Sequence, residues 1–258
     1  MFVALSVIMS ALAELSVNSA WYATVWAAMH IICRATSPNG LDQPKRAYWA
    51  SSMVSSVHGV YVSWLAWRAM AEGEYWSSED LSRRTPGALD CCHVYLGYLV
   101  ADLIPLIYYY NEWSGTSLYL VHHMLSVCSW GMMAIHGQLL GLASGLLLLE
   151  ATAPFTNGRW FLAELKRTSG PLYLVTGGCM ALSFFLLRVL LMGYFFVRYV
   201  IVLRNSFFAL PPAIYLTILL SYAFGYPLQL FWFRKIVLGL LKALGLVARS
   251  AKPKLAKC

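Results

Sequence analysis

Two adjacent histidines, His122 and His123, interrupt the apolar run of residues 117–130. A neutral imidazole can serve as a general base or a nucleophile, and a carboxylate bonded to its second nitrogen fixes the tautomer and raises the basicity. Acyl transfer onto a lipid amine or hydroxyl needs such a group and a groove for the acyl chain. The pair therefore predicts an active site inside a hydrophobic segment.

The pair does not have the spacing of a metal site. Two ligands share one helical face when they stand four residues apart, whereas adjacent residues on a helix diverge by about 100°. The six cysteines include no CxxC spacing, and several lie in apolar runs, as expected of small buried hydrophobic residues. We predict no metal site and no bound cofactor.

Further polar side chains lie in other apolar segments, where charged and imidazole groups are costly and mark functional sites by default. Ser55 and His58 share a helical face with Ser51, and Tyr98 shares one with Asp102. We expect one cavity to gather a catalytic set and a substrate-binding set. The predicted catalytic residues are His122, His123, Asp102 and Glu150. The predicted substrate-binding residues are His58, Ser55, Asn157, Arg159, Arg188, Tyr98, Tyr119 and Ser126.

Within the pair, His122 is the favoured base or covalent acyl acceptor because its helical stripe, shared with Tyr119 and Ser126, is the more polar. His123 would assist it. A carboxylate would orient an imidazole, and the sequence offers two of them, Asp102 and Glu150. Near the cytosolic mouth, two further residues would meet a lipid headgroup or a CoA phosphate, Asn157 and Arg159.

A structural interpretation of the same residues stays open. A buried histidine can hydrogen bond between helices, and an Asp with an Arg can form an interhelical ion pair. This alternative applies most directly to His58, Asp102 and Arg188.

The composition identifies the elements that must position these groups. The chain has 258 residues, of which 60% are hydrophobic and 12% charged, and its mean hydropathy is +0.63. A soluble domain carries about 25% charged residues. Several runs of roughly 20 apolar residues are long enough to cross a bilayer. We therefore expect an all-α polytopic membrane protein.

Seven transmembrane helices are predicted, the fifth of them short because Pro154 and Gly158 interrupt it. The expected spans are 8–33, 48–70, 92–110, 118–136, 139–155, 172–198 and 207–233. The expected organisation is a first helix outside the core (1–40), one membrane domain (41–240) and a basic cytosolic tail (241–258).

The net charge of +8 does not point to nucleic acid, because seven of the 19 Lys and Arg residues lie within residues 234–258. A basic segment directly after a hydrophobic span fits contact with anionic lipid headgroups. Counted over the loops, basic residues favour a lumenal N-terminus and a cytosolic C-terminus by the positive-inside rule.

Five motifs in order resemble the signature of the TLC-domain family, named for translocation-associated, ceramide-synthase and neuronal lipofuscinosis proteins. The resemblance covers about residues 45–240. The motifs are Trp49-Ala-Ser-Ser-Met-Val-Ser-Ser-Val-His58, Gly97-Tyr-Leu-Val-Ala-Asp102, His122-His123, Glu150-Ala-Thr-Ala-Pro-Phe-Thr-Asn157-Gly-Arg-Trp160 and Leu186-Leu-Arg188.

The resemblance implies six helices in a barrel-like bundle around a lipid cavity, an extra first helix, and residence in the endoplasmic reticulum. In ceramide synthases the histidine doublet belongs to the active site that transfers an acyl chain from acyl-CoA. Those enzymes carry paired aspartates before a Glu and Lys in a second acidic segment, whereas this chain has only Glu150 there. The pattern instead resembles the branch outside the ceramide synthases, which is linked to phospholipid acylation, membrane composition or trafficking.

The expected function is acyl transfer from acyl-CoA, as co-substrate, to a lipid acceptor through the histidine pair. Two alternatives remain: a non-catalytic lipid-binding, trafficking or membrane-composition protein, and an accessory subunit of a membrane complex. The expected partners are membrane lipids and acyl-CoA rather than nucleic acid, and a homodimer is left open.

Overall fold

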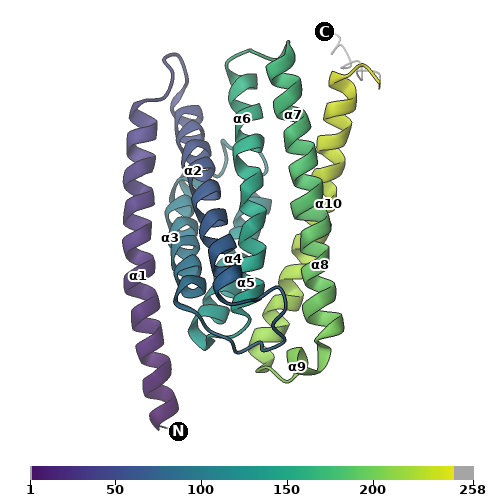
Figure 1. Ribbon diagram of the computed structural model, residues 1–258. Coiled ribbons are helices and arrows are strands. Elements are labelled where there is room, and N and C mark those ends of the chain that lie inside the picture. The colour runs from purple at the N-terminus through teal and green to yellow at the C-terminus, as the bar shows by residue number, and fades with distance from the viewer. Residues whose placement is uncertain (1, 247–258) are drawn as a thin grey trace, which may run out of the picture.

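The computed structural model describes residues 2–246, and all regular structure in this range is helical. Contiguous segments form seven long helical runs, and a short helix, α9 (Arg204–Phe208), lies between the last two (Figure 1). The first four runs are α1 (Phe2–Ala35), α2 (Gln43–Glu72), α3 (Pro86–Tyr108) and α4 (Thr116–His136). The fifth joins α5 (Leu140–Leu147), the 3-10 turn η1 (Leu148–Thr152) and α6 (Ala153–Glu164). The sixth joins α7 (Pro171–Ser183), the π-helical η2 (Phe184–Leu191), α8 (Met192–Phe196) and the π-helical η3 (Val197–Val202), and the seventh is α10 (Pro212–Ala243).

Local sequence fixes several helix ends. The Asp42 side chain accepts a hydrogen bond from the Lys45 backbone N–H at 2.9 Å, which caps α2. Thr85 caps α3 in the same way, and Pro86 follows at the first helical position, where a missing N–H costs nothing. Helix α4 ends at Gly137 with φ 62°, the left-handed conformation that glycine adopts without strain.

Four helices in the described range are long and apolar enough to cross a membrane: Pro86–Tyr108, Thr116–His136, Pro171–Val202 and Pro212–Ala243. Helix α2 is long but carries serines and His58, which lower its hydropathy. The chain is therefore an all-α polytopic membrane protein, and the count of seven spans stays a prediction.

The predicted interruption of the fifth helix at Pro154 and Gly158 is wrong. Pro154 lies in the first turn of α6, where its ring does not break the hydrogen-bond ladder, and the run continues to Glu164. The interruption comes earlier, as the 3-10 turn of residues 148–152.

Six of the long runs form a closed ring. Successive contacts join α2 to α3, α3 to α4, α4 to α10, α10 to α7, α7 to α6, and α6 back to α2. Helix α1 packs on the outside of this ring against α2 and α3. At that contact a side chain on Gly97 would collide with the Ser19 carbonyl oxygen, so glycine is what lets α1 approach α3 closely.

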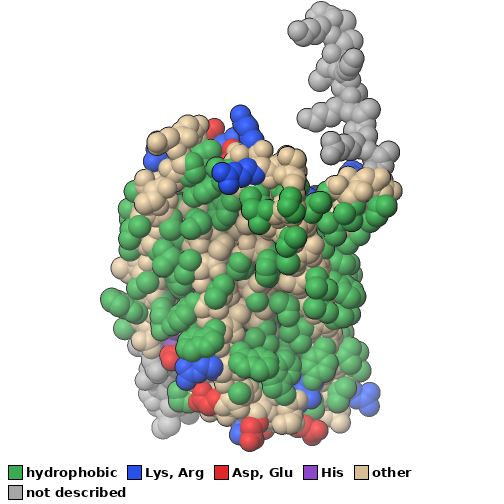
Figure 2. Space-filling model, turned by 45° about the horizontal axis from the view of Figure 1, so that its top comes forward, with side chains coloured by type: hydrophobic (Ala, Val, Ile, Leu, Met, Phe, Trp, Pro, Cys, Tyr) green, Lys and Arg blue, Asp and Glu red, His purple; other side chains and the backbone are tan. Residues whose placement is uncertain are grey.

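The bundle has two ends. Its upper end in Figure 1 carries the loops of residues 36–42, 109–115 and 165–170, and its lower end carries those of 73–85 and 203–211. Figure 2 shows hydrophobic side chains over the flank, with charged side chains gathered at the ends, as expected of a protein surrounded by lipid. The predicted tail beyond residue 246 lies outside the described residues.

Candidate functional site

Nine of the twelve predicted site residues line one cavity of about 330 Å³ inside the ring. Helices α2, α3, α4, α6 and α10 and the segments η1 and η2 contribute to its walls. Trp113 and Ser114 of an upper loop belong to its lining, so this upper cavity reaches the upper end of the bundle. The nine residues are Ser55, Tyr98, Asp102, Tyr119, His122, His123, Glu150, Asn157 and Arg188.

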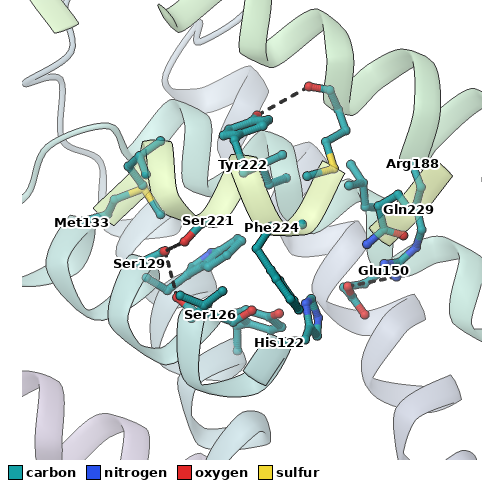
Figure 3. A pocket seen from close by; sticks show the side chains of 18 residues that line it. His122, Ser126, Ser129, Met133, Glu150, Arg188, Ser221, Tyr222, Phe224 and Gln229 are labelled. Carbon is teal, nitrogen blue, oxygen red and sulfur yellow. Dashed lines mark hydrogen bonds and ion pairs between the residues drawn. The ribbon is translucent and has the colours of Figure 1, made fainter. Parts of the chain in front are cut away.

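A lower chamber of about 70 Å³ continues toward the other end. Its lining includes Ser126, the tenth predicted residue. Figure 3 shows Ser126, Ser129 and Ser221 on one side of this chamber and Glu150 and Arg188 on the other. Four residues line both the upper cavity and the lower chamber, and they mark the junction between the two: Tyr95, His122, Glu150 and Arg188.

Both ring nitrogens of His123 face oxygen acceptors. Nδ1 lies 2.9 Å from the backbone carbonyl oxygen of Tyr119, one turn earlier on α4, and Nε2 lies 3.1 Å from Oδ2 of Asp102 on α3. A carbonyl oxygen only accepts hydrogen bonds, and so does an ionised carboxylate. If Asp102 is ionised, both nitrogens carry protons, and His123 is then an imidazolium paired with that carboxylate.

His122 has the opposite environment. Among the described residues no side chain or carbonyl hydrogen bonds its ring, which stands at 85° to the His123 ring with centroids 5.8 Å apart. The two side chains differ because adjacent positions on a helix point about 100° apart. His122 thus directs its imidazole into the junction, where a reacting group can reach a free nitrogen.

The Glu150 carboxylate is engaged with Arg188. Arg188 donates from Nη2 to Glu150 Oε1 at 3.1 Å and from Nε to Thr152 Oγ1 at 2.7 Å. The 3-10 turn η1 presents Glu150 and Thr152, and the π-helical η2 presents Arg188. Irregular helix of this kind is frequent at functional sites. Neither carboxylate that the sequence offered, Asp102 or Glu150, hydrogen bonds His122.

The glycine of α2 at position 59 allows η1 to lie this close. A Cβ built on Gly59 would stand 2.5 Å from the Glu150 carbonyl oxygen and 3.0 Å from the Ala153 Cβ. The close approach of the α2 and η1 backbones fixes the position of Glu150, which contacts Arg188.

His58 lines neither cavity, and its position does not support the predicted role in substrate binding. The ring is fully buried and stacks on Tyr98, with centroids 3.8 Å apart and planes 10° apart. The indole of Trp26 from α1 meets it edge-on at 5.3 Å. The structural interpretation fits this residue, which packs α1 against α2 and α3.

Asn157 and Arg159 are placed differently from each other. Asn157 lines the upper cavity, but its amide nitrogen donates to the Ser52 carbonyl oxygen at 2.9 Å and to Ser56 Oγ at 3.0 Å. These bonds tie α6 to α2. Arg159 lines neither cavity, and its guanidinium lies over the Tyr173 ring, 4.5 Å from the centroid.

The structure adds cavity residues that the sequence did not single out. Trp232 and Lys235 of α10 join the lining, and Trp232 stacks on Tyr119 with centroids 5.6 Å apart. Trp113 Nε1 donates to the Pro44 carbonyl oxygen at 3.0 Å and fixes the loop beside the cavity. The predicted seventh span ended at residue 233 and left Lys235 in the basic segment beyond it, whereas α10 continues to Ala243 and carries Lys235 into the cavity wall. Across residues 17–246, whose side chains the structure describes, no cluster of three or more His, Cys, Asp or Glu could hold a metal ion.

These features define an all-α membrane protein with a polar site buried in a helical ring. The family model of the TLC domain matches residues 48–238, and the chain belongs to the TLC-domain family. The relatives place it outside the ceramide synthases, which confirms the predicted branch.

A zebrafish protein, TLC domain-containing protein 4-B, is 30% identical over 234 residues, which cover 86% of this chain and 83% of that protein. The human TLC domain-containing protein 4 is 28% identical over 152 residues, 58% of this chain and 57% of its own length. The Dictyostelium discoideum TLC domain-containing protein 4 A is 23% identical over 206 residues, 79% of this chain and 78% of its own length. No solved structure matches the chain.

Proposed function

We propose that the protein is a membrane-embedded lipid acyltransferase that takes an acyl chain from acyl-CoA. The carrying observation is the position of His122, whose unbonded imidazole lies at the junction of the two cavities. A free ring nitrogen is what a base or nucleophile requires. In this proposal seven helices cross the membrane of the endoplasmic reticulum, and six of them enclose the lipid.

His122 supports two routes for the transfer. As a nucleophile, its nitrogen bonds to the thioester carbonyl carbon, the C–S bond breaks, and the CoA thiolate leaves. An acceptor hydroxyl or amine then takes the acyl group from the imidazole, and its proton passes to the CoA thiolate. As a general base, it accepts the proton of the acceptor while that oxygen or nitrogen attacks the thioester, and it returns the proton to the leaving sulfur. Either route moves one acyl group and one proton without any external reductant or oxidant.

The neighbouring positive charges stabilise the negative charge that develops on the thioester oxygen in the transition state. Arg188 lines the same junction as His122, and the His123 imidazolium lies beside it on α4. Positive groups already in place in a low-dielectric site stabilise such a transition state strongly. His123 acts here as a positioned charge rather than as a second base, because neither of its nitrogens is free.

The topology of the proposal puts the upper end in the cytosol. The upper cavity reaches that end, where a soluble acyl-CoA is available, and Lys235 belongs to its lining. The acyl chain would lie in the apolar interior, and membrane lipids would supply the acceptor.

Purified wild-type protein should transfer acyl groups from at least one member of a broad acyl-CoA panel to a lipid extract. His122→Ala should abolish the products. Failure of the wild type across the whole panel sinks the proposal, and so does full activity in His122→Ala.

A second candidate is a lipid-binding protein without turnover, and one observation favours it. Both carboxylates near the pair are committed elsewhere, Asp102 to His123 and Glu150 to Arg188. His122 therefore lacks the carboxylate that commonly orients a catalytic imidazole. Mass spectrometry of the purified protein separates the two candidates, since an intact bound lipid with no acylated histidine and no turnover supports binding alone.

A further inference from the structure

Arg159 lies outside both cavities and differs from Arg188 because its guanidinium has no acidic partner among the described side chains. Its Nη1 atom is buried without a hydrogen-bond acceptor, and the ion pairs of residues 17–246 include none with Arg159. Arg188, in contrast, reaches both a carboxylate and a hydroxyl. A buried guanidinium nitrogen without an acceptor is costly, so this group calls for an acceptor from outside the chain.

The nearest acidic residue on the same helix is already occupied. Glu164, five residues further along α6, pairs with Lys45 at 2.7 Å, and this contact raises the pKa of the Lys45 ammonium. The charge of Arg159 is thus left uncompensated by the described part of the chain.

The surroundings fix the position of the Arg159 guanidinium. Its carbon lies 4.5 Å from the centre of the Tyr173 ring, a cation–π contact that fixes its plane. A side chain on Gly177 of α7 would collide with Nη1, and a Cβ on Gly239 of α10 would stand 3.8 Å from Nη2. The room for Arg159 in the seam between α6, α7 and α10 therefore depends on Gly177.

The depth of this seam matches a membrane interface. Gly239 is one turn above Ile236, which lines the upper cavity, and Arg159 is one turn below the end of α6. Exposed basic residues surround the same end of the bundle, among them Lys166, Arg167 and Lys242. Lipid phosphates occupy this depth at a membrane surface, and basic residues there attract them.

We propose that Arg159, in the α6–α7–α10 seam, binds a phosphate group of a ligand whose chain enters the upper cavity. A guanidinium offers parallel donors that match two phosphate oxygens. The phosphate belongs either to a phospholipid headgroup or to CoA. This assignment deepens the proposed function and rests on it for those two candidate ligands.

The test measures binding rather than turnover, in the His122→Ala background, so that it does not depend on catalysis. The probes are short-chain phosphatidic acid, coenzyme A and a diacylglycerol of the same chain length, each titrated onto full-length protein in detergent. We expect at least one phosphate-bearing probe to bind about 10-fold more weakly to Arg159→Gln, with Arg159→Lys in between. Diacylglycerol should show no difference. Arg167→Gln, in an exposed loop, is the matched control and should bind like the parent.

If Arg159→Gln weakens the binding of phosphatidic acid alone, the phosphate belongs to a lipid headgroup. If it weakens the binding of coenzyme A alone, the phosphate belongs to the nucleotide. Equal binding of both phosphate probes to Arg159→Gln and to its parent overturns the proposal. A second pair of variants covers a failure of Arg159→Gln to fold. Gly177→Ala should displace the guanidinium and weaken phosphate binding, whereas Gly178→Ala, whose added Cβ meets no atom within 4 Å, should not. If wild-type protein transfers no acyl group from any acyl-CoA of the panel while phosphate binding still depends on Arg159, the proposed function fails and the phosphate site stands.

Discussion

His123 meets Asp102 across the α3–α4 contact, with Nε2 3.1 Å from Oδ2, while its other nitrogen faces the Tyr119 carbonyl oxygen at 2.9 Å. The two side chains are only 9% and 16% exposed. This arrangement gives the two histidines different roles. With Asp102 ionised, His123 is a fixed positive charge, and His122 keeps a nitrogen without a hydrogen-bond partner among the described residues.

The pairing predicts energetic coupling between the two residues. In a double-mutant cycle of His123→Ala and Asp102→Ala, we expect a coupling of about 0.5–3 kcal/mol in the free energy of unfolding. A matched cycle of His123→Ala with Asp90→Ala, which removes an exposed carboxylate on the same helix as Asp102, should show no coupling energy. Denaturant unfolding in detergent provides the values, and additivity of the first pair would argue against a paired imidazolium.

Removing one charge of the Glu150–Arg188 ion pair should lower the free energy of unfolding strongly. Glu150→Gln leaves a charged guanidinium in a site where its side chain is 13% exposed, and we expect a loss of about 3–5 kcal/mol. Replacing both residues, as Glu150→Leu with Arg188→Met, should recover much of that stability. Glu164→Gln, which breaks the exposed pair with Lys45, should have a much smaller effect. Equal losses for the two single variants would contradict this account.

Gly59 should be sensitive to a single methyl group. Gly59→Ala forces α2 and η1 apart, because the new Cβ would stand 2.5 Å from the Glu150 carbonyl oxygen. We expect a lower melting temperature together with weaker acyl transfer. Gly131→Ala on α4 is the control, because its Cβ meets no atom within 4 Å and alanine favours a helix by about 0.5–1 kcal/mol. If both variants melt like the wild type, the close approach of α2 and η1 is not rigid.

Much of the site could be predicted from the sequence, because polar residues in apolar helices are rare and mark the interior. Spacing alone placed Ser55 and His58 on one face. The structure separates them, since three residues along a helix turn the side chain about 60° from the starting direction. That turn moves His58 behind Tyr98 and out of the cavity.

The partners of the carboxylates could not be predicted. Which acid meets which base depends on the register between helices, and a single sequence carries no record of that register. The place of Trp232 and Lys235 in the cavity wall could not be predicted for the same reason. They line the cavity only because α10 closes the ring beside α4 and α7.

The most direct test of the central claim compares acyl transfer by two histidine variants of the same helix. The assay supplies a panel of acyl-CoAs and a lipid extract to wild type, His122→Ala and His136→Ala, and it measures acylated lipids by mass spectrometry. His136 is exposed in the last turn of α4, far along the helix from the junction. The account predicts products from wild type and His136→Ala and none above background from His122→Ala. Undiminished products from His122→Ala would contradict it.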